Sequence, residues 1–450
     1  MDRLHLRTAS LSPVVGFACA AALAVVALLA VVPAAHAASG DLAWRRQVVG
    51  PSNGSAAFEA LTGAPRGGVY AAGYIFDATG DMLATRFAVG GKRLWLRSPD
   101  FPTHAYDVAD AATTDRAGDL IVAGEVNYPS LSQEEAILKY GPNGKHLWTR
   151  YYNDSHAGQG TELVTDARGN VYVTTSTASQ DIVLIKYSAA GTRRWVRSYA
   201  GPGDDQPRGI AVDAAGNVYL TGLSYEVGTF YDIVTFKYDP AGHRKWVRRF
   251  NGQGSGDDLG YGIGVTPAGA VYVAGQTTRT GTGADAVVLK YNTRGRLLWT
   301  RAYSGTGAFD DWFNAIALLR NGDVAATGET SPDGTQVDVL TVRLSPAGHT
   351  RWRSTYDGPD SLADQGSFVA GGAGGAVYVA GTSDGATTGT DMLTVKYDGT
   401  GNQSWAERYT GTDASNDLVH GLVVTGRGVY VAGEEASNSG TIATLLKYRP

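Results

Sequence analysis

The sequence predicts an all-β protein that forms a single β-propeller, with eight four-stranded blades. Sixty of the 450 residues are glycine without a collagen-like period, which indicates many tight turns. Eight of the nine tryptophans recur at intervals of 47 to 53 residues. A repeat of about 50 residues that contains several short strand-like runs is typical of one propeller blade. A ring of seven blades is the alternative.

Two kinds of residue mark the repeat. The tryptophans are Trp44, Trp95, Trp148, Trp195, Trp246, Trp299, Trp352 and Trp405. The aspartates that begin successive repeats are Asp205, Asp258, Asp311, Asp364 and Asp417, each 53 residues apart, with Asp107 in an earlier copy. We expect the tryptophans to fill the space between adjacent sheets and the aspartates to accept hydrogen bonds from turn amides, so both sets are predicted to be structural.

The first 37 residues are predicted to be a signal peptide. Arg3 and Arg7 precede a nearly unbroken apolar run from Val14 to Val32, and Ala35-His36-Ala37 fits a signal-peptidase site. An uncleaved membrane anchor is the alternative. We therefore expect a secreted or cell-envelope protein whose mature chain, residues 38–450, is one propeller domain without a membrane span. That chain has no cysteine, because Cys19 lies in the leader.

Each repeat contains four strand-like runs. In the fourth copy they cover residues 209–212, 217–221, 232–238 and 244–250, and Gly-containing turns separate the first pair and the last pair. Residues 233–236 have no polar side, which favours a strand buried on both faces.

The two ends of the mature chain complement each other. The chain begins with a fourth strand around Trp44 and ends with a third strand at residues 446–448. Pairing of the two would complete the eighth blade and leave the ring without a free edge.

The fourth copy resembles the bacterial β-propeller repeat family SBBP. The residues that carry the resemblance are GDDQPRGIAVDAAGNVYLTG at 203–222 and DIVTFKYDPAGHRKW at 232–246. The resemblance implies an exported bacterial propeller of undefined activity and assigns no catalytic residue. The family name refers to seven blades, so eight copies depart from it.

The turns that precede the tryptophans, such as residues 239–246, are also similar to the tryptophan-docking motif of eight-bladed quinoprotein dehydrogenases. That similarity implies a quinone cofactor, but its site typically uses adjacent cysteines, which the mature chain lacks. No cofactor is predicted. Bound Ca²⁺ is an alternative at the acidic doublets, with Asp204, Asp257 and Asp310 as ligands, although no single loop offers the usual set of oxygens.

The longer, more variable loops, such as residues 153–160 and 223–231, should share one face of the ring, and function is expected there. At the predicted end of the second strand the register is constant but the side chain differs. This position holds Tyr74, Glu125, Ser176, Leu223, Gln276, Glu329, Thr382 and Glu434. Glu125 and Glu329 fall in opposite blades and are expected to face one pocket.

Other residues complete the candidate set on this face. His104 and His420 accompany Glu125, Glu329 and Glu434 as candidates for acid–base chemistry. Trp312 lies off the tryptophan register, in a predicted loop of this face, where it could stack on a sugar or a partner. With Tyr74 it is a candidate ligand-binding residue.

A non-catalytic binding scaffold for a glycan or protein ligand is the favoured function. A net charge of −5 argues against a nucleic-acid partner, and the repetition favours a monomer. A polysaccharide lyase or hydrolase that uses the glutamates is the alternative, followed by a quinone- or metal-dependent oxidoreductase. No phosphate loop, zinc cluster or Gly-x-Ser-x-Gly elbow occurs in the sequence.

Overall fold

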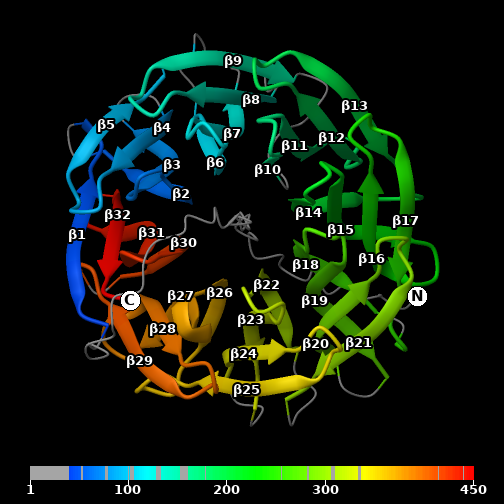
Figure 1. Cartoon of the computed structure of the whole chain (residues 1–450). Helices are drawn as coiled ribbons and strands as arrows, with labels where there is room; N and C mark the ends of the chain where they lie inside the picture. Colours follow the sequence, from blue (N-terminus) through cyan, green and yellow to red (C-terminus); the bar gives the residue numbers. More distant parts are fainter. Residues whose placement is uncertain are drawn as a thin grey trace, which may run out of the picture.

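The protein is a ring of eight four-stranded antiparallel sheets whose innermost strands surround the ring axis, and we call this central region the channel (Figure 1). The structure, a computed structural model, describes residues 40–51, 54–76, 80–99, 101, 106–127, 133–152, 161–177, 179–254, 256–280, 283–305, 310–332, 336–413, 415–438 and 440–450. The predicted signal peptide lies outside these residues. Among them there is one short 3₁₀ turn, Ala373–Gly375, and no helix long and apolar enough to cross a membrane.

The first four blades follow the chain in order. Blade 1 holds β2 (Ala56–Gly63), β3 (Val69–Phe76), β4 (Gly80–Phe87) and β5 (Arg93–Arg97). Blade 2 holds β6 (Val108–Thr114), β7 (Leu120–Asn127), β8 (Gln133–Tyr140) and β9 (His146–Tyr152). Blade 3 holds β10 (Glu162–Thr165), β11 (Val171–Ser176), β12 (Ile182–Tyr187) and β13 (Arg193–Tyr199). Blade 4 holds β14 (Asp205–Val212), β15 (Val218–Glu226), β16 (Phe230–Tyr238) and β17 (Arg244–Phe250).

The remaining blades keep this pattern until the ring closes. Blade 5 holds β18 (Leu259–Val265), β19 (Val271–Arg279), β20 (Gly283–Tyr291) and β21 (Leu297–Tyr303). Blade 6 holds β22 (Trp312–Leu318), β23 (Val324–Thr330), β24 (Asp338–Leu344) and β25 (Thr350–Tyr356). Blade 7 holds β26 (Asp364–Gly371), β27 (Val377–Gly385), β28 (Gly389–Tyr397) and β29 (Gln403–Tyr409). Blade 8 holds β30 (Asp417–Thr425), β31 (Gly428–Ser437), β32 (Gly440–Tyr448) and β1 (Leu42–Val48).

Both ends of the chain build blade 8, as the sequence predicts. β1 pairs antiparallel with β32, from Leu42 opposite Tyr448 to Val48 opposite Ala443. The first strand of each blade lies nearest the channel and the fourth lies at the rim (Figure 1). The eight-bladed prediction is confirmed, and the seven-bladed alternative is excluded.

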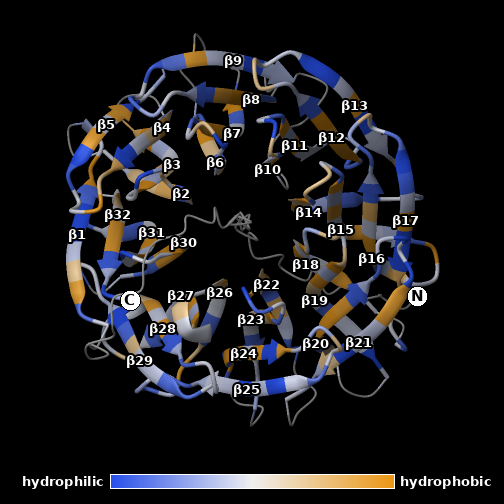
Figure 2. Cartoon of the chain, in the orientation of Figure 1, coloured by the Kyte–Doolittle hydropathy of each residue, from blue (hydrophilic) through white to orange (hydrophobic). Residues whose placement is uncertain are grey.

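The core lies between the faces of neighbouring blades. Residues 233–236 of β16 are all buried, as expected of a strand covered on both sides. The rim strands are more polar: β17 alternates exposed and half-buried positions around Trp246, and hydrophilic colours run along β17 and β25 (Figure 2). Each hydrophobic cluster therefore joins two blades, as when Trp246 packs with residues of β19 and β20.

The recurrent tryptophans connect neighbouring blades. Trp246 is 8% exposed, and its indole N–H donates to the Thr293 carbonyl of the next blade at 3.2 Å. Its ring lies against Gly295, where an added Cβ would come within 2.7 Å of the ring and where φ is +75°. The Arg248 side chain, two residues on, donates from Nε to the Gly295 carbonyl at 2.7 Å.

The recurrent aspartates are buried at the start of the innermost strands. Asp258 accepts hydrogen bonds from the backbone amides of Gly252 at 2.7 Å and Thr278 at 3.0 Å. Asp311 does the same with the amides of Gly305 and Ser331. One carboxylate thus connects the loop that precedes a blade with the second strand of that blade. It accepts hydrogen bonds from backbone amides at the point where the strand pairing ends.

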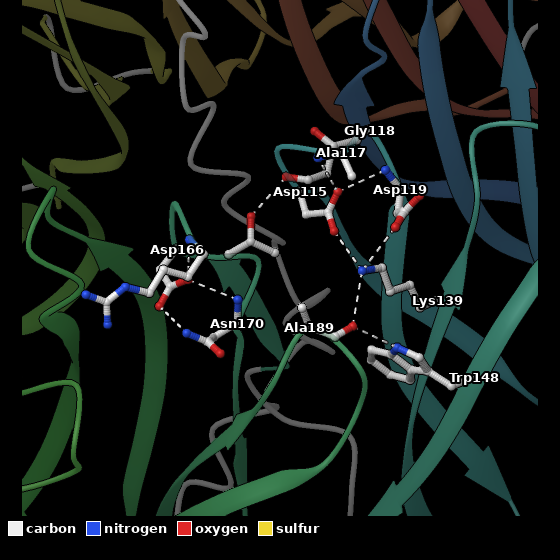
Figure 3. A network of polar contacts seen from close by, with 12 residues as sticks. Asp115, Ala117, Gly118, Asp119, Lys139, Trp148, Asp166, Asn170 and Ala189 are labelled. Atoms are coloured by element: carbon white, nitrogen blue, oxygen red, sulfur yellow. Dashed lines mark hydrogen bonds and ion pairs between the residues drawn. The ribbon is translucent and has the colours of Figure 1, made fainter.

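A buried ion pair lies between blades 2 and 3, on the face of the ring opposite the loops that connect the blades (Figure 3). Lys139 Nζ is 2.7 Å from Asp115 Oδ2 and 3.1 Å from Asp119 Oδ2. It also donates to the Ala189 carbonyl of blade 3, which accepts from the Trp148 indole as well. Asp115 in turn caps its own turn by accepting from two backbone amides.

One expected loop is a strand extension instead. Residues 223–231 were predicted to be a long variable loop, but β15 continues to Glu226 and β16 begins at Phe230. Gly228 with φ of +98° and Phe230 with φ of +63° allow the tight turn that joins them. The position predicted to end the second strand lies inside it in most blades, because these hairpins extend beyond the apolar core.

Candidate functional site at the channel mouth

A β-bulge recurs near the start of the innermost strand. In seven blades one residue of the first strand has no partner on the second strand. These residues are Glu59, Asp110, Arg208, Tyr261, Asn314, Ser367 and His420. Bulges redirect a side chain relative to the regular pleat and are frequent beside functional sites. The bulge occurs at the same place in these seven blades, whereas the side chain of the bulged residue differs from blade to blade.

The bulged residue contacts the variable second-strand position that the sequence singles out. The Tyr261 hydroxyl lies 3.3 Å from Gln276 Oε1, and His420 Nε2 lies 3.9 Å from Glu434 Oε1. Both positions lie toward the face with the loops that connect the blades. Together they line the mouth of the channel on that face.

Blades 8 and 1 bring a histidine between two glutamates. His420 Nδ1 is 3.4 Å from Glu59 Oε2, and one ligand atom each from Glu59, His420 and Glu434 lie within 4.8 Å of one another. Burial alone would lower the pKa of His420, but the charges of Glu59 and Glu434 outweigh it and raise the pKa. The triad therefore favours an imidazolium between carboxylates.

The carboxyl groups continue into blade 2. Burial raises the pKa of Asp110 well above its usual value. The negative charges of Glu125, Glu135 and Glu59 raise this pKa further. Burial raises the pKa of Glu125 to about 7 and that of Glu135 to about 8. We call Glu59, Asp110, Glu125, Glu135, His420 and Glu434 the mouth cluster.

An aromatic rim borders the mouth cluster. The rings of Tyr74, Phe76 and Tyr106 lie 4.9 to 5.6 Å apart. The Tyr74 hydroxyl donates to Glu434 Oε2 at 3.3 Å, and Tyr106 is 43% exposed beside the same carboxylates. This combination of acceptors and partly exposed aromatic faces is suited to a polar ligand with apolar patches.

The other side of the mouth has different chemistry. Blade 4 contributes Arg208, whose pKa is lowered by burial, and blade 5 contributes Tyr261. Blade 6 contributes Glu329, which is 2% exposed and has a pKa raised to about 8 by burial, against hydrogen bonds from Asn314 and Trp312. Among the residues that the structure describes, the carboxyl groups of the mouth cluster come from blades 8, 1 and 2, whereas blade 6 contributes Glu329.

The structure brings together four of the residues selected from the sequence and separates the others. Tyr74, Glu125, His420 and Glu434 lie in or beside the mouth cluster. Glu125 on β7 and Glu329 on β23 lie in opposite blades of the ring, as the sequence predicts (Figure 1). That the two face one pocket stays a prediction.

Trp312, expected in a loop, is the first residue of β22 and pairs with Glu329. His104 lies outside the described residues. Asp204, Asp257 and Asp310 lie in three separate blades, and each accepts a hydrogen bond from a neighbouring hairpin. None of the three belongs to a group of metal-binding side chains among the residues that the structure describes.

Sequence reasoning missed Glu59, Asp110 and Glu135. Asp110 and His420 each stand three residues after a recurrent aspartate, as do Arg208 and Tyr261. A polar residue that varies at this constant offset, among small and apolar neighbours, would have indicated the bulge. Glu59 gives no such signal, because Ala56 replaces the aspartate in the first copy.

A separate groove of about 300 Å³ lies between the rim strands of blades 1 and 2. Arg97, Phe101, Tyr140, His146 and Tyr151 are among its lining residues. No carboxyl group occurs among the described residues that line it, so acid–base chemistry is better supported at the channel mouth.

Replacing Glu329 by glutamine is expected to make stability less dependent on pH. The folded-state pKa of about 8 is above the ordinary value. The stability that the protonated carboxyl contributes is therefore fully present below about pH 4.5 and is lost as the pH rises through 8. The free energy of unfolding of the Glu329→Gln variant should exceed that of the parent by up to roughly 4–5 kcal/mol at pH 9, because a pKa raised from 4.5 to about 8 costs about 1.4 kcal/mol per unit, and by little at pH 4. Urea denaturation at both pH values measures this, and equal differences at the two would contradict the pKa shift.

Residues 194–226 match the family model described as SBBP, beta-propeller repeat. This segment is similar to the SBBP repeat. It covers most of β13 and all of β14 and β15, and the resemblance seen in the sequence is confirmed there. No match was found among curated proteins.

Two solved structures are reported as similar to this chain. Sqt1 from Chaetomium thermophilum superimposes with a TM-score of 0.57 at 14% identity, covering 91% of this chain and 99% of that chain. The WD40 domain of coronin from Toxoplasma gondii gives a TM-score of 0.46 at 9% identity, covering 75% and 80%. At these identities the likeness to Sqt1 shows the fold alone.

Proposed function

We propose that this chain is an exported, monomeric binding propeller that holds a glycan at the mouth cluster and its aromatic rim. The observation that carries the proposal is the concentration of carboxyl groups and tyrosines at one side of the channel mouth, in blades 8, 1 and 2. The SBBP repeat and the predicted leader support export.

The chemistry of the site favours a glycan. Glu59 and Glu434 remain partly exposed, with side-chain exposures of 17% and 18%, so their oxygens are within reach of a ligand. Carboxylates accept hydrogen bonds from sugar hydroxyls, and the exposed Tyr106 ring offers an apolar surface for a sugar face. The repeated blades form a rigid scaffold that holds these differing side chains in fixed positions, and ligand recognition requires such fixed positions.

A second function, cleavage of the bound polysaccharide, is favoured by the pKa of Glu125. A carboxyl group that titrates near 7 is suited to general acid catalysis, and Asp110 beside it supplies a second carboxyl. Glu434 and His420 would assist on the same side of the mouth, whereas Glu329 would not.

The experiment is a binding screen of bacterial and plant polysaccharides against residues 38–450. For a polysaccharide that binds, the Tyr106→Ala variant should weaken affinity at least about tenfold, because it removes the exposed stacking surface. The His349→Ala variant on the opposite face should bind like the parent. Release of reducing ends or unsaturated products would establish the second function. Affinity unchanged by Tyr106→Ala would contradict the proposed site.

A further inference from the structure

Glu59, His420 and Glu434 offer a compact set of metal ligands. Glu59 is the bulged residue of β2, His420 is the bulged residue of β30, and Glu434 lies on β31. One oxygen or nitrogen from each lies within 4.8 Å of the others. Ligands bound to one ion at 2.0–2.2 Å are separated by about 3–4.4 Å. Because Glu59 faces Nδ1 and Glu434 faces Nε2 of His420, one glutamate must rotate toward the nitrogen that binds the ion.

A second observation indicates that something binds there. His420 is 5% exposed, and its Nε2 atom is buried without a hydrogen-bond partner. Glu434 Oε1 lies 3.9 Å away from it, beyond hydrogen-bond distance. A buried polar atom that lacks a hydrogen-bond partner is costly. A metal ion that replaces the imidazolium proton on Nε2 would remove that cost, because a ligating imidazole is neutral and its proton is released on binding.

We propose that Glu59, His420 and Glu434 bind one divalent transition-metal ion, of the zinc class, across the seam where blade 8 meets blade 1. An imidazole nitrogen with two carboxylates suits zinc, whereas Ca²⁺ prefers six to eight oxygens. Three protein ligands leave a coordination position for water or a ligand group. The metal site shares Glu59 and Glu434 with the proposed glycan site, but it does not rest on glycan binding, because metal binding is measured without a glycan.

Tyr74 orients the set. Its hydroxyl donates to Glu434 Oε2 at 3.3 Å, which leaves Oε1 directed toward His420. Mutation of a residue that hydrogen-bonds to a metal ligand commonly lowers metal affinity by about 10- to 100-fold. Because Glu59 belongs to blade 1 and the other two ligands to blade 8, a bound ion would also link the first and last blades and stabilise the closed ring.

The test is Zn²⁺ binding to tag-free residues 38–450 after EDTA treatment and dialysis. Stoichiometry is measured by elemental analysis and affinity by competition with a chromophoric chelator, with Ca²⁺ as the comparison ion. We expect one Zn²⁺ per chain, a higher melting temperature with Zn²⁺, and no such effect of Ca²⁺. Absence of stoichiometric Zn²⁺ from the folded parent would overturn the proposal.

Variants assign the ion to these residues. Glu434→Gln and His420→Gln should each weaken Zn²⁺ binding by roughly 100-fold, and Tyr74→Phe by roughly tenfold. His349→Ala removes an exposed histidine on the opposite face and should bind like the parent. Glu434→Gln keeps the shape of a partly exposed side chain, so it separates ligand loss from misfolding. Unchanged binding by a folded Glu434→Gln variant would overturn the site.

Discussion

Replacing Lys139 by alanine is expected to lower the free energy of unfolding by about 3–5 kcal/mol. Lys139 is 4% exposed and lies between Asp115 and Asp119 (Figure 3). Without it the buried Asp115 carboxylate loses its counter-charge, and the Ala189 carbonyl of blade 3 loses a donor. Urea denaturation of the single variant measures the loss.

Two further variants test the cause. Lys145→Ala removes an exposed lysine from the same blade and should change stability by less than about 0.5 kcal/mol. Lys139→Met combined with Asp115→Asn removes both charges but keeps a side-chain oxygen for the turn, and should recover most of the loss. A double variant as unstable as Lys139→Ala would show that the uncompensated carboxylate is not the cause.

Replacing Trp246 by alanine is expected to cost about 3–5 kcal/mol as well. The ring packs between Tyr219 and Tyr291, with centroids 6.0 and 6.3 Å away, and lies against Gly295 of the next blade. Its removal leaves a cavity at a blade interface and an unused carbonyl at Thr293.

Leu297→Ala is the control for that prediction, because Leu297 is 40% exposed on the rim strand of the next blade. It should cost less than about 0.5 kcal/mol. Gly295→Ala should reproduce part of the Trp246→Ala effect from the other side, since φ is +75° and the added Cβ would meet the indole. If Trp246→Ala lowers the free energy of unfolding no more than Leu297→Ala does, the tryptophans do not join the blades.

The fold was predictable because each repeat carries the same signals. Tryptophan spacing fixed the number of blades, and the incomplete repeats at the two ends predicted the pairing of β1 with β32. The lengths of the hairpins at the variable face were not predictable. Residues 223–231 contain no apolar alternation that distinguishes a strand extension from a loop, and the tight turn depends on positive φ at Gly228 and Phe230.

The candidate site was predictable in part. The constant register of the second strand identified Glu125 and Glu434, but the chemistry of each depends on bulged residues from the neighbouring strand or blade. Glu59 meets His420 only because the two ends of the chain meet in the ring, about 360 residues apart in sequence. Sequence spacing does not encode such a contact directly.

The central claim is that the ligand binds at the carboxylate-rich side of the channel mouth. Glu125 and Glu329 test it directly, because they occupy the same register in opposite blades and both have raised pKa values. The measurement is the affinity of a polysaccharide found in the screen for Glu125→Gln and Glu329→Gln. The account predicts a loss of at least about tenfold for Glu125→Gln and less than about twofold for Glu329→Gln. The reverse order would contradict it and place the ligand at blade 6.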